Sequence, residues 1–325
     1  MKVAVTGASG HIGASLCREL LHHGYEVVAL IHRDISALKG LPISIVQGDI
    51  LNTESIKQLL GQCDMAIHAA AAIELAYKFD KNVYDTNVLG TINVLETAQE
   101  MGVRRLVHFS SIHAFSQACY DQPLDETRAF VNDNSIFYDQ TKRDSHRLAL
   151  NACEAGLDVV ILNPTSAIGP PDQKPSLLGK AVIDLYKGSL PFVVQGGFDF
   201  CDVRDIAFGA VKALEKGRKG EAYLLSGHYH SIKELADFVM EAKNSKKRLV
   251  ELPLYIANIA FPFVKFYSWL TKKPPLFDKT YIDILQDGNK NVSSAKAEAE
   301  LGFTSRDLRE SVEDTVKWFK DNGRL

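Results

Sequence analysis

Short apolar runs alternate with segments of helical spacing through the first half of the chain. In the helical segments, apolar residues recur three and four positions apart, as at residues 82–101, where Gly102 then provides a C-terminal cap signal. Strands that alternate with helices in this way predict a parallel, doubly wound α/β sheet. The apolar runs that we expect to be strands are residues 3–5, 25–31, 43–47, 65–68, 105–110 and 159–162.

The turn after the first apolar run is rich in glycine. Gly7, Gly10 and Gly13 separate that run from a helical pattern. Gly7 allows a tight turn, Gly10 lets the backbone approach a pyrophosphate, and Gly13 allows close packing of the helix on the strand. The helix N-terminus adds about half a positive charge. A strand, a glycine turn and a helix in this order predict a dinucleotide-binding site.

The regular alternation ends after Pro164 with a Pro-rich loop at residues 169–176, and helical patterns then dominate to the C-terminus. A predicted helix at 203–216 and a short strand at 222–225 return to the first region. We therefore expect a Rossmann-type nucleotide-binding domain, residues 1–165 plus about 203–225. A smaller, mostly helical substrate-binding region would comprise about 166–202 and 226–325.

One later segment, residues 252–270, combines helical spacing with few charges, although Pro262 interrupts it. We expect a helix of the substrate-binding region that packs on the core. The alternative is an apolar lid for a lipophilic substrate, or a surface that touches a membrane.

The composition is ordinary for a soluble globular protein, with 46% hydrophobic and 24% charged residues. The net charge of -3 and the scattered Lys and Arg residues give no reason to expect nucleic acid, so small molecules are the expected partners. The 5 cysteines form no CxxC pair, which predicts reduced thiols, no metal site and a cytoplasmic location. We expect neither a signal peptide nor a transmembrane segment, since no apolar run reaches about 18 residues.

Tyr138 and Lys142 stand four residues apart on a predicted helix, and therefore on one face of it. The ammonium is expected to lower the pKa of the phenol, which could then exchange a proton with a carbonyl or alcohol oxygen. Taken alone, this spacing is common and more often marks a surface pair on a solvated helix.

The order of the motifs is more specific than any one of them. TGxxGxxG, a strand that ends in Ser110 and Ser111, and the Tyr138–Lys142 pair resemble the extended short-chain dehydrogenase/reductase family. The similarity covers nearly the whole chain and is greatest to dihydroflavonol-reductase-like and 3β-hydroxysteroid-dehydrogenase-like members. Further matching segments are Gly48-Asp49, residues 68–71, residues 87–91, Pro164-Thr165, residues 293–296 and residues 300–303.

The resemblance implies a catalytic set. Tyr138 would be the general acid/base, and Lys142 would bind the nicotinamide ribose while lowering the tyrosine pKa. Ser111, rather than Ser110, would hydrogen-bond the substrate oxygen. Asn87 would steady a water behind Lys142, or would simply bond to backbone.

The resemblance also implies a cofactor-binding set at the strand ends. Asp49 and Ile50 would meet the adenine, and small residues after the fourth strand would admit the ribose. The whole set is Gly7, Ser9, Gly10, His11, Ile12, Gly13, Asp49, Ile50, Ala69, Ala70, Ala71, Tyr138, Lys142, Pro164 and Thr165.

The end of the second strand indicates which dinucleotide binds. A carboxylate there would accept hydrogen bonds from a ribose 2′-hydroxyl and repel a 2′-phosphate. The chain has His32 and Arg33 at this point, with no carboxylate before Asp34, and Lys39 could reach the same phosphate. NADP(H) is therefore expected and NAD(H) remains possible, while a solvated basic turn is the alternative.

Three reactions share this catalytic set: carbonyl reduction, nucleotide-sugar epimerisation and sugar dehydration. Family dehydratases place two acidic residues after the strand-end hydroxyl, where this chain has Ile112 and His113. His113 could carry a proton, although a histidine bonded to nearby backbone is the favoured interpretation. Phe198 stands where nucleotide-sugar enzymes commonly have Arg, and Asn163 replaces another frequent Arg.

We therefore expect reduction of an apolar ketone or aldehyde, with hydride transfer from NADPH and with Tyr138 as the proton donor. A nucleotide-sugar epimerase is the alternative enzyme. A sensor or scaffold that binds NADP without chemistry is the alternative of another class. A homodimer through the helices that carry Asn87 and Tyr138 is possible.

Overall fold

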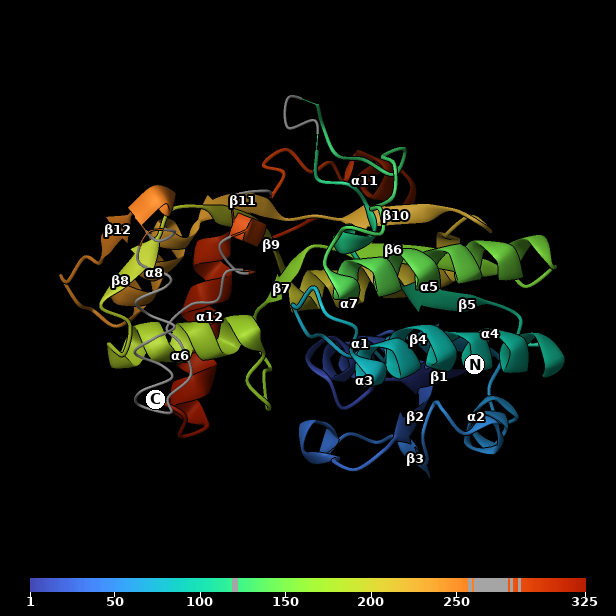
Figure 1. The fold of residues 1–325 in the computed structure, drawn as a ribbon. Helices are drawn as coiled ribbons and strands as arrows, with labels where there is room; N and C mark the ends of the chain where they lie inside the picture. The colour runs from blue at the N-terminus through green and yellow to red at the C-terminus, as the bar shows by residue number, and fades with distance from the viewer. Residues whose placement is uncertain (119–121, 257–258, 260–279, 281–282, 286–287) are drawn as a thin grey trace.

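The computed structural model describes residues 1–118, 122–256, 259, 280, 283–285 and 288–325 (Figure 1). A seven-stranded parallel sheet forms its centre, in the order β10-β6-β5-β4-β1-β2-β3. Each strand predicted from an apolar run of the first half, and the later one at 222–225, is present in this sheet, which confirms the predicted fold class. The strands are β1 Lys2–Thr6, β2 Glu26–Ile31, β3 Ser44–Gln47, β4 Met65–His68, β5 Leu106–Phe109, β6 Val159–Pro164 and β10 Ala222–Leu225.

Helices cover both faces of the sheet because successive strand residues point to opposite sides. Val3 and Val5 of β1 pack in the core shared with α1 and α7, whereas Ala4 between them packs in the core shared with α2, α4 and α5. The helix at 203–216 is confirmed as α7. These helices are α1 His11–His22, α2 Thr53–Leu60, α4 Gly90–Glu100, α5 Phe137–Glu154 and α7 Val203–Lys216.

The helix predicted at residues 82–101 exists but is not regular. It consists of α3, Lys81–Tyr84, a π-helical turn, Asp85–Leu89, and α4. Gly102 follows with a φ of 65°, so the predicted glycine stop is confirmed. Residue spacing alone did not indicate the π turn, which contains the buried Asn87.

The second region lies beside the sheet and contains a core of its own (Figure 1). Its helices, α6 Leu177–Lys187, α8 Ile232–Ala242 and α12 Leu308–Asp321, were expected from the helical patterns. Short strands that those patterns did not predict lie among them, in a three-stranded sheet, β11-β9-β7, and a β12-β8 pair. They are β7 Ser166–Ile168, β8 Phe192–Val194, β9 Gly197–Asp202, β11 His228–Ser231 and β12 Val250–Leu252.

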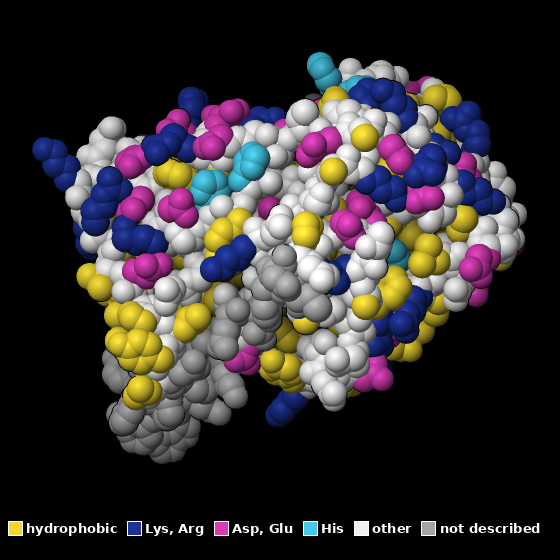
Figure 2. Space-filling model, turned by 90° about the horizontal axis from the view of Figure 1, so that it is seen from above, with side chains coloured by type: hydrophobic (Ala, Val, Ile, Leu, Met, Phe, Trp, Pro, Cys, Tyr) yellow, Lys and Arg dark blue, Asp and Glu magenta, His cyan; other side chains and the backbone are white. Residues whose placement is uncertain are grey.

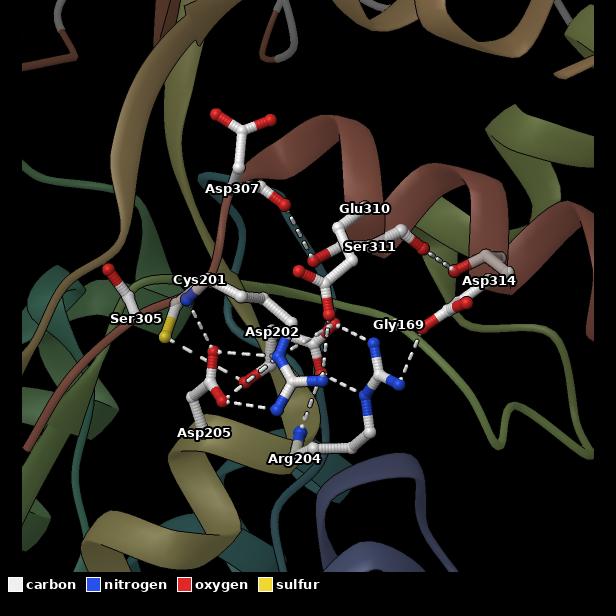
Figure 3. Close-up of polar contacts among 12 residues, drawn as sticks. Gly169, Cys201, Asp202, Arg204, Asp205, Ser305, Asp307, Glu310, Ser311 and Asp314 are labelled. Atoms are coloured by element: carbon white, nitrogen blue, oxygen red, sulfur yellow. Dashed lines mark hydrogen bonds and ion pairs between the residues drawn. The ribbon is translucent and has the colours of Figure 1, made fainter.

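A network of ion pairs connects β9, α7 and the segment that leads into α12 (Figure 3). The side chain of Asp202 is 0% exposed and caps α7 through the backbone N–H of Arg204. The Arg204 guanidinium donates to both oxygens of Asp202, at 2.8 Å each, and to Asp314 at 2.7 Å. Arg306 donates in turn to Asp205 at 2.7 Å. The network therefore holds the C-terminal helix against the junction of the two regions.

Two further features are the charged side chains of the surface and the apolar segment at residues 252–270. Seen from above, the molecule mixes Lys and Arg with Asp and Glu side chains (Figure 2). Among the described residues, no helix has both the length and the apolar character needed to cross a membrane. Most of the predicted helix at residues 252–270 lies outside the described residues.

Candidate active site

The glycine turn between β1 and α1 leaves room for backbone but not for side chains. Gly7 has a φ of +70°, and a Cβ atom on it would lie 2.6 Å from the backbone of Ala69. A Cβ atom on Gly13 would lie 2.0 Å from the carbonyl oxygen of Gly7. Both positions therefore require glycine, for the turn and for the close packing that the sequence predicted.

The start of helix α1 fits a phosphate group. Gly10 is the N-cap and provides no side-chain cap, and the first turn contains no acidic residue. The first N–H groups of a helix lack partners within it and carry partial positive charge. An anion at this end would satisfy them, so the turn fits the diphosphate of a dinucleotide.

A cavity of about 350 Å³ extends from this turn to Tyr138. It opens at the carboxyl ends of β1 and β4, where the strand order of the sheet reverses and where ligands bind in folds of this kind. The predicted site residues that line it are Gly7, Gly10, His11, Ile12, Gly13, Ala69, Ala71, Ser111, Tyr138, Lys142, Pro164 and Thr165.

The other predicted cofactor residues lie elsewhere. The backbone N–H of Ala70 donates to Thr6 Oγ1, and Ile50 packs against Gly90. His32 lies 3.6 Å from Asp49, and Arg33 is exposed. Ser9 and Lys39 line a second cavity, of about 300 Å³, which shares Gly10 and His11 with the first.

The hydroxyls and the ammonium of the predicted catalytic set do converge. Ser111 follows β5 and lines the cavity together with Tyr138 of α5, whose pKa its side chain lowers. Lys142, one turn further along α5, is 3% exposed and donates from Nζ to the carbonyl oxygen of Phe109 at 2.8 Å. Ser110 also lines the cavity, but its hydroxyl lies 3.1 Å from Nδ1 of His146. The structure therefore gives the two serines different partners.

The predicted effect of Lys142 on the tyrosine is wrong for this structure. Burial raises the pKa of Tyr138, the neighbouring Asp139 raises it further, and only the hydrogen bond from Ser111 opposes them. The Lys142 ammonium is directed at the Phe109 carbonyl instead of the phenol, and burial lowers its own pKa to about 8. Tyr138 is therefore a neutral phenol at neutral pH, able to donate a proton.

Asn87 bonds to its neighbours in the protein. Its amide nitrogen donates to the carbonyl oxygen of Ala72 at 2.9 Å and to Thr141 Oγ1 at 3.0 Å, and its oxygen accepts from the Ala72 N–H at 2.8 Å. These contacts fit the alternative of a polar helix residue that bonds to backbone. Asn87 fixes the loop after β4 against α5, and Thr141 lies next to Lys142 in that helix.

Three buried histidines behind the site were not singled out from the sequence. His68 bonds to Thr6 and Thr91, and His146 bonds to Ser110, whereas neither ring nitrogen of His108 has a partner among the described residues. Burial, with the nearby Lys142, lowers the pKa of His68 and of His146 to about 3. The rings are therefore neutral at neutral pH, and Lys142 carries the only positive charge among these four groups.

His113 has a side-chain partner rather than the backbone partner that was favoured. Its Nδ1 lies 3.1 Å from Asp139 Oδ1, and its ring packs edge-on against Tyr138 with 5.7 Å between ring centroids. The sequence contained a signal for this pair, because His113 follows Ser111 by two positions and Asp139 directly follows Tyr138. Residues next to two motif positions that converge are expected to lie close together.

The two positions that depart from the sugar-nucleotide pattern differ in location. Phe198 lines the cavity, so an aromatic ring stands on its substrate side. Asn163 is 0% exposed and donates to the carbonyl oxygen of Ser111 at 2.9 Å. It therefore supports the loop that carries Ser111 and does not decide the polarity of the cavity.

The fold and the site define a dinucleotide-dependent enzyme with a tyrosine, a serine and a lysine at the end of its cofactor cleft. The chain belongs to the NAD dependent epimerase/dehydratase family, whose model matches residues 3–226. Its relatives include named reductases, and the chain is an NAD(P)-dependent oxidoreductase that acts on CH–OH or C=O groups.

Two relatives match over nearly their whole length. "Sterol demethylase protein B" of Methylococcus capsulatus is 32% identical over 331 residues, with 100% of both chains covered. A Synechocystis sp. protein named "Putative dihydroflavonol 4-reductase" is 31% identical, with 98% of this chain and 94% of the relative covered. A solved structure titled "Crystal structure of gox2253" superposes with a TM-score of 0.86 at 27% identity, and 99% of each chain is covered.

Proposed function

We propose that the protein reduces an apolar ketone or aldehyde to an alcohol with NADP(H), and that Tyr138 is the general acid. The convergence of Tyr138, Ser111 and Lys142 on the cavity that begins at the glycine turn carries this proposal. When bound, the dinucleotide supplies the hydride. The side chains of the protein bind the substrate oxygen and supply the proton.

Two hydroxyls are available to the carbonyl oxygen of the substrate. Ser111 and Tyr138 both line the cavity, and the Ser111 side chain lowers the pKa of Tyr138, so an oxygen placed beside one hydroxyl is expected to lie within reach of the other. As negative charge develops on that oxygen, both donors stabilise it, and Tyr138 gives its proton to the alkoxide. Lys142, as a buried cation in the same cavity, would bind the nicotinamide ribose, the other role that the family resemblance gives it.

The charges around the glycine turn support the preference for NADP. Asp34, the first carboxylate after β2, is bonded to Lys174 at 2.8 Å and to the backbone N–H of Ser36 at 2.7 Å. It is thus engaged and less available to a ribose hydroxyl. Lys174 and Arg18, whose guanidinium donates to the Ala14 and Ala37 carbonyl oxygens, line the cavity of about 300 Å³ beside Ser9 together with Lys39, and Lys39 would favour a 2′-phosphate there.

The lining of the cavity of about 350 Å³ supports an apolar substrate. Phe198 and several aliphatic side chains line its wall. Position 198 holds Phe instead of the Arg that would be expected to bind a sugar diphosphate. A ketoreductase of Stigmatella aurantiaca and a cinnamoyl-CoA reductase of Petunia hybrida are also among the relatives. The aliphatic residues of the wall are Ile73, Leu75, Leu177, Leu178 and Ile284.

An absorbance assay of nicotinamide oxidation tests the proposal. NADPH and NADH are each supplied with aldehydes, ketosteroids, flavonoid-type ketones and UDP-sugars, and the products are analysed. We expect net oxidation of NADPH with an apolar carbonyl compound, a loss of about 10²- to 10⁴-fold in Tyr138→Phe, and unchanged NADPH binding in that variant. Tyr84→Phe, on α3 and away from the cavity lining, is the matched control.

Other outcomes would select the other functions. A sugar product without net change in nicotinamide absorbance would indicate an epimerase. Tight NADP(H) binding without turnover of any carbonyl compound would indicate a sensor or scaffold. Full turnover in Tyr138→Phe would contradict the role given to that residue.

A further inference from the structure

His113 lies where two cavities adjoin. One is the cavity that reaches the glycine turn, and the other, of about 380 Å³, extends toward β9 and the loop before α5. Both are lined by His113, Thr165, Ser166, Phe198 and Ile284. A substrate held at Ser111 and Tyr138 would therefore extend past the imidazole of His113.

The position of Asp139 distinguishes the two ring nitrogens of His113. Nδ1 faces the carboxylate at 3.1 Å, and the structure gives Nε2 no hydrogen-bond partner within the described part of the chain. The edge-on contact with the Tyr138 ring holds the imidazole beside the phenol. Nε2 is thus the ring nitrogen that remains for a ligand in the two cavities that His113 lines.

The charged groups around the ring determine what it can bind. Burial favours a neutral His113 and Lys142 also opposes its charge, but Asp139 outweighs both and raises the pKa above its ordinary value. Asp199 of β9 and Asp283 line the same cavity as Asp139. A protonated His113 donates from Nε2 to an acceptor, while the three carboxylates disfavour an anionic group on the substrate.

We propose that His113 determines specificity by donating from Nε2 to a second, uncharged carbonyl oxygen within one or two carbons of the carbonyl that is reduced. The inference rests on the proposed carbonyl reduction. Ser111 and Tyr138 hold the oxygen of the reacting carbonyl, and His113 is two residues from the one and in ring contact with the other. Dicarbonyl compounds are therefore preferred over simple ketones, and keto acids are disfavoured.

Three aryl ketones test the preference with the full-length protein and NADPH. They are 1-phenyl-1,2-propanedione, propiophenone, which lacks the second oxygen, and phenylglyoxylate, which carries it as a carboxylate. Two variants separate the ring nitrogens, because an Asn amide nitrogen replaces Nδ1 and a Gln amide nitrogen replaces Nε2. We expect His113→Asn to raise the KM of the dione about tenfold, or about 1.4 kcal/mol, with little change in kcat.

The other expected KM values follow from the loss or replacement of the Nε2 donor of His113. The KM of propiophenone should be the same in the wild type, His113→Asn and His113→Gln. In the wild type, the KM of the dione should rise as pH increases through the pKa of His113, since the donor is then lost. His113→Gln should keep a low KM that no longer depends on pH. Equal effects of His113→Asn on the dione and on propiophenone would overturn the proposal.

A binding measurement makes the test independent of turnover. Nitrogen NMR of protein with labelled imidazole rings follows His113, assigned by its loss in His113→Gln. With NADP bound, saturating dione should shift the Nε2 resonance, propiophenone should not, and Asp139→Asn should lower the pKa of the ring. A dione that binds without shifting Nε2 would refute the role of His113. Failure of all carbonyl compounds to oxidise NADPH would instead contradict the proposed function.

Discussion

The ion-pair network at the start of α7 and the cluster around Lys142 both bury ionisable groups, but they treat charge in opposite ways. In the network, burial would raise the pKa of Asp202, yet its hydrogen bonds with Arg204 lower it overall. Lys142, by contrast, meets one backbone carbonyl oxygen and, within the described ranges, no carboxylate, and its pKa falls to about 8. Charges satisfy one another in the network and stay uncompensated in the cluster.

This difference separates a structural site from one prepared for a ligand. A buried ion pair is stable only when its partners match, so removing one partner leaves a costly charge. A buried group without a full set of partners costs stability in the free protein and is available to a substrate or cofactor. The comparison predicts that substitutions in the network affect stability, whereas substitutions in the cluster affect turnover.

The largest expected effect belongs to Lys142. Lys142→Met removes the cation but keeps most of the volume of the side chain. Turnover of a carbonyl substrate should fall about 10²- to 10⁴-fold, because the cavity loses the cation that would hold the nicotinamide ribose in place for hydride transfer. The free energy of unfolding in urea should be lower by no more than about 1 kcal/mol, since one hydrogen bond is lost and one buried charge is removed. A loss of several kcal/mol would place Lys142 with the structural network instead.

Arg204→Met should give the opposite result. It leaves Asp202 buried without its main partner and should lower the free energy of unfolding by about 3 kcal/mol in urea titrations. Turnover per folded molecule should stay near that of the wild type. Adding Asp202→Asn to Arg204→Met should recover part of the loss, because the orphaned charge is gone. An inactive but fully stable Arg204→Met variant would break the comparison.

The sequence predicted the features of these two regions that depend on residues close together in the chain, and it missed contacts between residues far apart. The glycine turn, the strands of the seven-stranded sheet and α7 follow from local patterns, so they were predicted close to their observed bounds. Motif order also brought Ser111, Tyr138 and Lys142 together correctly. The ion pairs of Arg204 with Asp314 and of Arg306 with Asp205 join residues far apart in sequence, and no local spacing indicates them.

The errors at the site have the same origin. The sequence places an ammonium one turn from Tyr138, but the direction of Lys142 toward Phe109 depends on how α5 lies against β5. For Asn87, by contrast, the sequence left two alternatives open, and its contacts with Ala72 and Thr141 fit the one in which it bonds to backbone. Motifs thus identified the residues, whereas burial and orientation determined their protonation.

At alkaline pH, we expect a difference of intermediate size in the free energy of unfolding. The pKa of Lys142 is lowered from 10.5 to about 8, so between these values the unfolded chain holds a proton that the folded protein has released. Unfolding is then less favourable as pH rises, and the wild type should gain up to about 1.4 kcal/mol per pH unit relative to Lys142→Met between pH 8 and 10. Urea titrations at several pH values measure this difference. Parallel curves for the two proteins would show that the ammonium is not perturbed.

The smallest effect is expected from a pair of histidines that differ only in their partners. His108 is buried with both ring nitrogens unpartnered among the described residues, so His108→Leu should leave stability in urea unchanged or raise it by about 1 kcal/mol. His68→Leu should lower it by about 2 kcal/mol, since Thr6 and Thr91 lose their partner.

The change in stability at acidic pH provides a second test of His108. Burial holds its pKa far below 6.5, so as pH falls below 6.5 the unfolded chain takes up a proton that the folded protein does not, and stability declines. His108→Leu should therefore lose less stability than the wild type between pH 6.5 and 5. If instead His108→Leu were strongly destabilised at neutral pH, the ring would have to be bonded in solution, and the cluster around Lys142 would be as fully satisfied as the network at α7.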